Sequence, residues 1–439
     1  MTVYPIKGKE IYAFASTTVR LSPNTVSLSP NTARLGRNTV RLSYKTATRI
    51  GGAMATMIKY VTRILLAGSM MGLSIMTAAH NPQHRAEVKI GCAVPLSGAQ
   101  AHYGRDFLNG VILAVEEFNA THPIIGGKPI RIVLNTMDDR ADPRMAIMVA
   151  KKLVDQKIKG VLGHFNSGTT ISASHVYAKA GIPQIAMASA PQYTQQGYKT
   201  TFRMTASDLQ QDAVISAFVA KNLGLKRIAI IDDRTTYGQA LADQFAQIAT
   251  AEGVDIVGRE YGNDKTIDFK ALLTRLKRIK PQAIFYGGVD AQAAAVVKQM
   301  QALKIKAVLI ASEGVKSETF LKLAGPAAEG TVALSICLSP DKMPRGQEYA
   351  EHYKKRFGEK VQTYSPYAYD GAMAMLNAMK TADATEPEKY LPYLAKIEMP
   401  AITIKTLAYN AHGDLKQSDM VVYKVVDGQW HTLSIIRGK

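Results

Sequence analysis

The chain lacks the motifs of most enzymes. It contains no GxGxxG after a strand, no Walker A loop, no HExxH, no GxSxG elbow and no CxxC. Its nine histidines are scattered without metal-ligand spacing. These absences argue against nucleotide-dependent, hydrolytic and metal-dependent catalysis, so we expect neither a cofactor nor a metal.

Cysteine is also scarce. The two cysteines, Cys92 and Cys337, lie in the apolar, strand-like runs KIGCAV and VALSICLS. A buried thiol in such a run behaves as a small hydrophobe, so we expect no disulfide between them. Neither cysteine ends the apolar N-terminal segment, so the lipid-attachment pattern is missing and a soluble protein is expected.

Acidic residues are almost absent from the first 85 positions. This segment holds 11 Lys and Arg against one acid, Glu10, and so supplies +10 of the formal charge of +19. The remaining +9 is spread over a long chain with no Arg-rich stripe. This distribution argues against nucleic-acid binding.

No apolar run is long enough to predict a membrane span. Residues 1–53 include a period-seven repeat (TVRLSPN, TVSLSPN, TARLGRN, TVRLSYK), which prolines interrupt, and we interpret them as a non-native extension. Residues 54–85 contain a basic stretch followed by sixteen apolar or small residues, 64–79. A spanning helix needs ~20, so this region predicts a cleaved secretory signal peptide and a periplasmic protein, its mature end between His80 and Glu87.

From Glu87 onward, short apolar runs alternate with amphipathic segments of helix length, the pattern of parallel sheets with crossover helices. Strands are expected at 88–94, 130–134, 160–163, 183–188, 227–231, 256–260, 283–286 and 308–311. Eight strands are too many for one half, and the polar stretch TASDLQQD interrupts the run. We therefore predict an α/β fold of two Rossmann-like lobes joined by hinge strands: residues 86–206 plus 336–407, and residues 207–335 plus 408–439.

The loop after the strand at 160–163 is the strongest candidate site. Open α/β sheets bind ligands at the carboxyl ends of their strands, and Ser167 opens a helix there, where free N–H groups attract a carboxylate. An ordinary Ser/Thr helix cap is the alternative. His164 beside it has a structural role or, in a rival enzyme hypothesis, serves as base to a nucleophilic Ser167, although the sequence supplies no orienting acid.

Segments along nearly the whole chain, taken in order, resemble one family. They include VKIGCAVPLSGAQAHYGRDFLNGVILAVEEFNA, DDRADP, GVLGHFNSGTT, RIAIIDDRTTYGQALAD, SEGV, TYSPYAYDGA and AHGDLKQ. They are similar to the leucine/isoleucine/valine-binding periplasmic receptors of ABC importers, whose fold is that of type I binding proteins. The resemblance implies a monomer that captures a free amino acid by hinge closure and delivers it to the importer's membrane permease. The alternative is a receptor of the same fold for another small amide or amino acid, which signals to a sensor partner.

The resemblance also implies seven ligand-binding residues: Tyr103, Ser167, Ala188, Ser189, Ala190, Tyr237 and Glu313. Ser167 would bind the ligand carboxylate, Glu313 would receive the α-ammonium, and Tyr237 would close over the ligand. The register within Ala188–Ala190 stays open, because the chain is one residue shorter there and has Met187 where the family commonly has proline.

Two departures from the family pattern affect the expected pocket. Val289 replaces the family's aromatic residue of the second lobe, and Ala141 and Asn166 stand where some members have a disulfide. Loss of a ring removes an apolar wall, so we expect altered side-chain selectivity.

Overall fold

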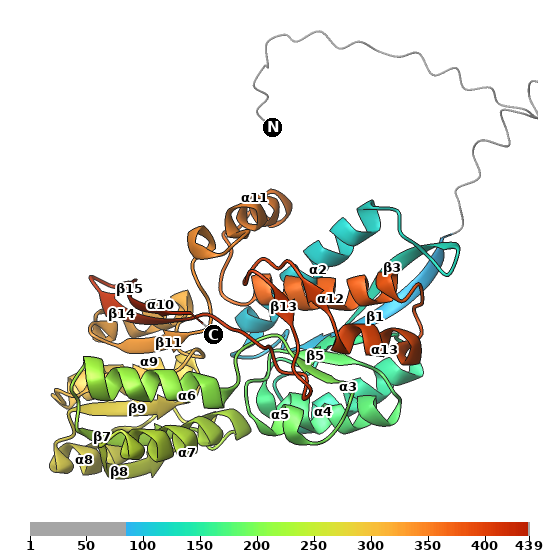
Figure 1. The fold of residues 1–439 in the computed structure, drawn as a ribbon. Coiled ribbons are helices and arrows are strands. Elements are labelled where there is room, and N and C mark those ends of the chain that lie inside the picture. Colours follow the sequence, from blue (N-terminus) through green and yellow to red (C-terminus); the bar gives the residue numbers. More distant parts are fainter. Residues whose placement is uncertain (1–84, 438–439) are drawn as a thin grey trace, which may run out of the picture. The chain divides into compact units, whose positions relative to one another are not determined.

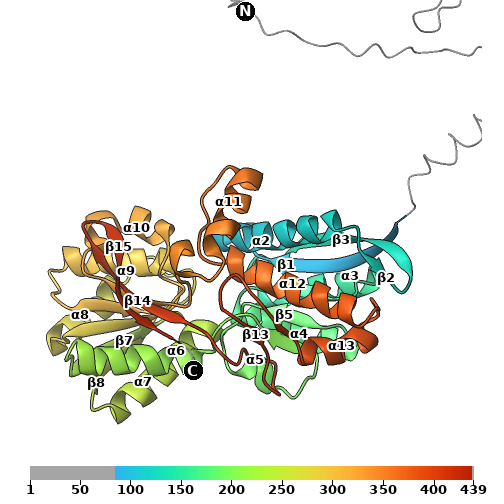
Figure 2. The same ribbon diagram turned by 45° about the horizontal axis from the view of Figure 1, so that its top comes forward.

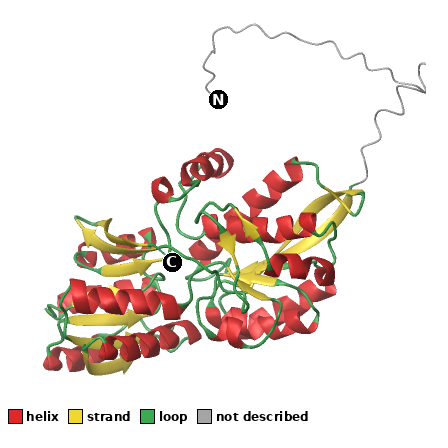
Figure 3. Cartoon of the chain, viewed as in Figure 1, coloured by secondary structure: helices red, strands yellow, loops and turns green. Residues whose placement is uncertain are grey.

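The structure of the chain is a computed structural model, and it describes residues 85–437. The expected extension (1–53) and signal region (54–85) lie outside this range apart from Arg85. The described residues form two large β-sheets, each with helices beside it (Figures 1 and 3). Among residues 85–437, no helix combines the length and the apolar character needed to cross a membrane.

The first sheet has six strands in the order β2-β3-β1-β4-β5-β6. Its strands are β1 (Ala86–Val94), β2 (Ile124–Ile125), β3 (Lys128–Asp138), β4 (Val161–Gly163), β5 (Gln184–Ala186) and β6 (Thr201–Arg203). All neighbours pair in parallel except the short β2 with β3. The helices between them are α2 (Ala101–Ala120), α3 (Pro143–Asp155), α4 (Ser167–Lys179) and α5 (Gln192–Gln195).

The second sheet has seven strands in the order β15-β14-β11-β10-β9-β7-β8. Its strands are β7 (Arg227–Asp232), β8 (Asp255–Tyr261), β9 (Ala283–Gly287), β10 (Val308–Ala311), β11 (Val332–Ser335), β14 (Met420–Val426) and β15 (Gln429–Ile436). The first five are parallel, and β14 and β15 join antiparallel. Its helices are α6 (Asp208–Ala217) with the π-helical turn Phe218–Asn222, α7 (Thr236–Ala251), α8 (Lys270–Ile279), α9 (Asp290–Ala302), α10 (Glu318–Ala324) and the 3-10 turn Gly325–Ala328.

The chain passes between the sheets three times. After β11 and a 3-10 turn (Pro340–Lys342) come α11 (Gly346–Phe357), α12 (Ser365–Thr381) and α13 (Pro387–Ala395), then the small hairpin β12 (Glu398–Met399) and β13 (Leu407–Ala408). Helices α11 and α12 contact α2, and α12 contacts β4 and β5, so these helices belong with the first sheet (Figure 2). We call the first sheet with its helices lobe 1, and the second sheet with its helices lobe 2. This architecture confirms the predicted α/β class with parallel sheet cores.

The last crossing lies later than the sequence suggested. We expected residues 408–439 to belong to lobe 2, but the segment after β13 still contacts β6: the Arg203 N–H donates to the Gly413 carbonyl, and Asp414 binds the Arg203 guanidinium. The chain joins the second sheet only at β14. A buried arginine that needs a carboxylate holds this segment on lobe 1.

Strand β7 shows why helices cover both faces of a sheet. Residues Ile228–Ile231 are all fully buried. Ile228 and Ile230 share a core with Phe245 of α7, whereas Ala229 and Ile231 share another with residues of α8 and α9. Because successive strand side chains point to opposite faces, a continuous apolar run needs a helix on each side.

Candidate ligand-binding site

The loops at the carboxyl ends of five strands converge on one small cavity. Strands β4 and β5 of lobe 1 lead to Ser167 and Ser189, and strands β7, β9 and β10 of lobe 2 lead to Tyr237, Val289 and Glu313. The cavity has a volume of about 30 Å³. Its lining is Tyr103, Phe165, Asn166, Ser167, Met187, Ser189, Tyr237, Val289, Glu313, Gly314 and Tyr364. The site therefore lies between the lobes, where open α/β sheets place ligands.

Helix α4 presents its N-terminus at the lobe 1 side of the cavity. Ser167 is its first residue, and the preceding Asn166 makes no side-chain hydrogen bond that would cap it. The Asn166 amide instead donates to Gln100 Oε1 at 2.5 Å. Ser167 Oγ accepts a hydrogen bond of 3.3 Å from the Ala190 N–H, so its own proton remains free to donate. A helix N-terminus with a hydroxyl donor is suited to a carboxylate.

Glu313 is the acid of the site, on the lobe 2 side. Its Oε2 accepts a hydrogen bond of 2.7 Å from the hydroxyl of Tyr364 in lobe 1. Burial raises the pKa of Glu313, while the hydroxyls of Tyr364 and Tyr237 partly offset that shift. A carboxylate that loses water in this way is stabilised by a cation placed beside it.

The backbone of Gly314 joins the two lobes. Tyr103 OH of lobe 1 donates to the Gly314 carbonyl at 2.8 Å, and the Gly314 N–H donates to Tyr237 OH at 3.2 Å. A Cβ atom here would lie 3.0 Å from the Tyr237 hydroxyl and 3.2 Å from the Gly288 carbonyl oxygen. A side chain at this position would therefore push the Tyr237 ring or the loop aside by a few tenths of an ångström.

Three aromatic rings of lobe 1 form an apolar wall. Tyr103 stacks on Phe165 with centroids 5.5 Å apart, and Tyr364 meets both rings edge-on at 5.6 Å and 4.8 Å. Opposite them, lobe 2 contributes the smaller Val289. The apolar part of the site is therefore built mainly by one lobe.

The loop carrying Ser189 is fixed from behind by Arg203, the last residue of β6. This fully buried guanidinium donates to the carbonyl of Ala188, to that of Ala190 at 3.1 Å, and to Asp414 Oδ1 at 2.8 Å. Ala188 and Ala190 do not line the cavity, whereas Ser189 between them does. Arginine satisfies the two carbonyls and leaves the serine facing the site.

A buried acid lies beside this loop. The Asp208 N–H donates to the Ser189 carbonyl at 2.8 Å, and the Asp208 side chain is fully buried. Burial raises the pKa of Asp208 to about 7, the hydroxyl of Ser189 and the charge of Arg203 opposing the shift. Asp208 therefore keeps its proton to a higher pH than an exposed aspartate does.

The structure brings five of the seven sequence-predicted residues to the cavity: Tyr103, Ser167, Ser189, Tyr237 and Glu313. Five further lining residues were not predicted from the sequence: Phe165, Asn166, Met187, Gly314 and Tyr364. Phe165 and Asn166 directly precede Ser167, so their place in the same strand-end loop was the available signal. Tyr364 had no local signal, because only the return of the chain to lobe 1 places it here.

His164 is held inside lobe 1. Its Nδ1 lies 2.6 Å from Asp139 Oδ2 and its Nε2 lies 3.2 Å from Tyr177 OH, and the side chains of His164 and Asp139 are fully buried. Asp139 is the orienting acid that the sequence did not reveal. Because Asp139 and Tyr177 occupy both ring nitrogens, His164 has a structural role in lobe 1. Within residues 85–437, no group of three or more His, Cys, Asp or Glu could hold a metal ion.

A two-lobed α/β fold with a polar and aromatic site between the lobes is the architecture of binding proteins that close on small molecules. Residues 87–429 match the family model described as "Periplasmic binding protein". The chain belongs to this family, whose members are periplasmic binding proteins.

Particular relatives narrow the comparison. The chain is 34% identical over 340 residues to a "Leu/Ile/Val-binding protein homolog 1" of Brucella suis, covering 77% of this chain and 90% of the relative. It is also 34% identical over 373 residues to an "Amino acid binding protein" of Pseudomonas aeruginosa, covering 84% and 96%. A branched-chain amino acid transporter substrate-binding protein of Streptococcus pneumoniae, solved with isoleucine, has a TM-score of 0.73 and 25% identity, covering 80% of this chain and 99% of that one.

Proposed function

We propose that this protein captures a free amino acid, of the branched-chain class, between its two lobes and delivers it to an ABC importer when it closes. The observation that carries this proposal is the opposition of the α4 N-terminus with Ser167 in lobe 1 and Glu313 in lobe 2 around one cavity. The relatives named as Leu/Ile/Val-binding and amino-acid-binding proteins support it.

A zwitterion fits this opposition of charges. The α-carboxylate takes hydrogen bonds from the Ser167 hydroxyl and the helix N-terminus, and the α-ammonium binds Glu313. The side chain then lies against the rings of Tyr103 and Tyr364 and against Val289. In this assignment Ser189 and Tyr237 also contact the ligand, whereas Ala188 and Ala190 hold Ser189 in place.

Hinge closure is supported by the contacts that the two lobes make around the cavity, whose lining comes from both of them. The hydrogen bonds Tyr103–Gly314 and Tyr364–Glu313 cross between the lobes. Entry of a ligand therefore requires the lobes to separate, and we propose that the importer's permease recognises the closed arrangement.

Binding without turnover is part of the proposal. Ser167 Oγ accepts from the Ala190 N–H, and both nitrogens of His164 are engaged by Asp139 and Tyr177. The geometry therefore gives Ser167 no hydrogen bond to the base that nucleophilic catalysis needs. We further propose export as a monomer by the signal region 54–85, with no nucleic-acid partner and no cofactor.

Calorimetric titration with leucine, isoleucine, valine, alanine and glutamate tests the ligand class. Leucine should bind about 50-fold more tightly than alanine, because three extra buried carbons contribute about 0.8 kcal/mol each. Tightest binding of alanine or glutamate would refute the branched-chain class but not amino-acid capture. Binding of none of the five, together with native mass spectrometry showing a ligand that is not an amino acid, would refute the whole proposal.

A further inference from the structure

One charged contact links the lobes outside the ligand cavity. His102, the second residue of α2 in lobe 1, places its Nε2 2.9 Å from Oδ2 of Asp290, the first residue of α9 in lobe 2. Ser317 Oγ donates to the same Asp290 oxygen at 2.7 Å. The other oxygen, Oδ1, is buried without a hydrogen-bond partner. Asp290 Oδ2 is thus contacted from both lobes, by His102 of lobe 1 and by Ser317 of lobe 2.

The contact is tied to the ligand cavity through the neighbours of both residues. Tyr103 follows His102, Val289 precedes Asp290, and both of these line the cavity. Closure that brings Val289 opposite Tyr103 therefore also brings Asp290 to His102. When the lobes separate, the same movement parts the pair.

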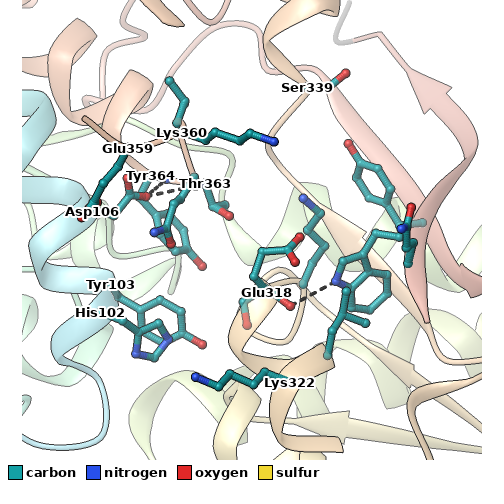
Figure 4. Close-up of a pocket in the computed structure, with 18 of the residues that line it drawn as sticks. His102, Tyr103, Asp106, Glu318, Lys322, Ser339, Glu359, Lys360, Thr363 and Tyr364 are labelled. Atoms are coloured by element: carbon teal, nitrogen blue, oxygen red, sulfur yellow. Dashed lines mark hydrogen bonds between the residues drawn. The ribbon is translucent and has the colours of Figure 1, made fainter. Parts of the chain in front are cut away.

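The two partners differ in their access to water. The Asp290 side chain is 1% exposed, whereas that of His102 is 25% exposed. His102 lines a separate cavity of about 1110 Å³, whose walls come from both lobes. Figure 4 shows this cavity, with His102, Tyr103 and Asp106 on one wall and Glu318 and Lys322 on the other.

We propose that His102 and Asp290 are positioning residues for ligand capture, forming a latch between the lobes that stabilises the closed state and so raises ligand affinity. This inference rests on the proposed function, since it assumes a ligand that is held by closure. The contact is an ion pair only when the imidazole is protonated. The latch therefore makes affinity depend on pH.

Other charges around the imidazole modulate the latch. The groups that line the same cavity are Asp106, Lys316, Glu318, Lys322, Glu359 and Lys360. Asp106 accepts from the backbone N–H groups of Thr363 and Tyr364, and the ring of Tyr103 lies 3.9 Å from that of His102. Asp290 is the carboxylate within hydrogen-bond distance of the imidazole, so it dominates the local interaction.

The expected pH effect has a definite sign. Imidazoles take up protons as pH falls from about 8 to about 5. Closure around a protonated His102 gains the ion pair, so leucine should bind more tightly at pH 6 than at pH 8, by about 3- to 10-fold for one partly exposed pair. His102→Gln keeps a neutral donor but cannot charge, so it should remove the part of the pH dependence that the latch supplies.

A double-mutant cycle on leucine affinity tests the coupling. His102→Ala and Asp290→Asn should each weaken leucine binding at pH 6 by about 3- to 10-fold, and the double variant should bind no more weakly than the poorer single variant. His352→Gln is the matched control, because His352 lies 2.8 Å from Glu117 within lobe 1. This substitution should change neither the affinity nor its pH profile.

Two outcomes would overturn the latch. One is an unchanged wild-type pH profile in His102→Gln, and the other is additive losses in the cycle, which would show that Asp290 acts only on its own helix and Ser317. In either case leucine still binds the wild-type chain. Failure of leucine to bind the wild type at any pH would instead refute the proposed function, so the two failures are distinguishable.

Discussion

The two walls of the cavity carry different chemistry. Lobe 1 supplies the hydroxyls of Ser167 and Ser189 and a cluster of three rings, but no charged side chain. Lobe 2 supplies a single acid, Glu313, with Tyr237 and the smaller Val289. Neither wall alone can satisfy both ends of an amino acid, which is why an open protein would hold such a ligand weakly and a closed one tightly.

Removing Glu313, the acid of the lobe 2 wall, should have the largest effect on ligand affinity. Glu313→Ala should weaken leucine binding by about 3 to 5 kcal/mol, because the ammonium is then buried between the lobes without its partner. The measurement is isothermal titration of the purified protein. The fold should survive, as circular dichroism would show.

The 2-oxo analogue of leucine supplies the internal control for Glu313. It has the carboxylate and side chain but no ammonium, so Glu313→Ala should spare it relative to leucine. Equal losses for both ligands, or no loss for leucine, would show that Glu313 does not receive the ammonium.

Asp208, beside the Ser189 loop, should make the free energy of unfolding depend on pH. Its folded pKa is about 7 against a usual 3.8, so the folded chain holds a proton that the unfolded chain has released. The raised pKa adds up to about 4 kcal/mol to the free energy of unfolding. This stabilisation is complete below about pH 4 and is lost as the pH rises to about 7. Asn cannot titrate, so Asp208→Asn should remove this loss. Between pH 5 and pH 7.5 the free energy of unfolding, measured by urea titration, should fall less in the variant than in the wild type. A wild-type pH dependence in the variant would refute the assignment.

The fold was accessible from the sequence because its signal is repeated and local. Apolar runs such as 227–231 are buried on both faces of a sheet, and that burial produces the pattern that predicts the strand. The strand-end loop likewise predicted Ser167, because loops at the carboxyl ends of parallel strands lie at the ligand edge, whereas Glu313 was implied by the resemblance to the family.

The remaining site residues depend on chain crossings that leave no local trace. Tyr364 reaches the cavity only because α12 packs against α2 of lobe 1. Arg203 turns the carbonyls of Ala188 and Ala190 away from the site, and it does so with help from Asp414, which is 211 positions away. Spacing in sequence carries no information about such contacts.

Ser167→Ala distinguishes the contribution of the ligand carboxylate to affinity from that of the ammonium. Loss of one hydrogen bond to a charged group should weaken leucine and its 2-oxo analogue alike, by about 1.5 to 3 kcal/mol. Ser174→Ala, on the same helix, removes a buried hydroxyl that donates to the Ile171 carbonyl and should leave both affinities unchanged. A loss confined to leucine would place Ser167 at the ammonium instead.

The smallest expected effect concerns the apolar part of the lobe 2 wall. Val289→Tyr adds a ring opposite Tyr103 and Tyr364, so bulky ligands should lose more affinity than small ones. Phenylalanine should lose about 1 to 2 kcal/mol more binding free energy than valine, which narrows the ligand range. Val289→Ile is the matched control, because it changes little volume and adds no ring. A calorimetric panel of valine, leucine and phenylalanine measures the ranking. If Val289 shapes the side-chain pocket, the ranking changes in the tyrosine variant and not in the isoleucine variant. Equal losses for all three ligands would mean instead that the added ring only hinders closure, and the selectivity would then reside in the ring cluster of lobe 1.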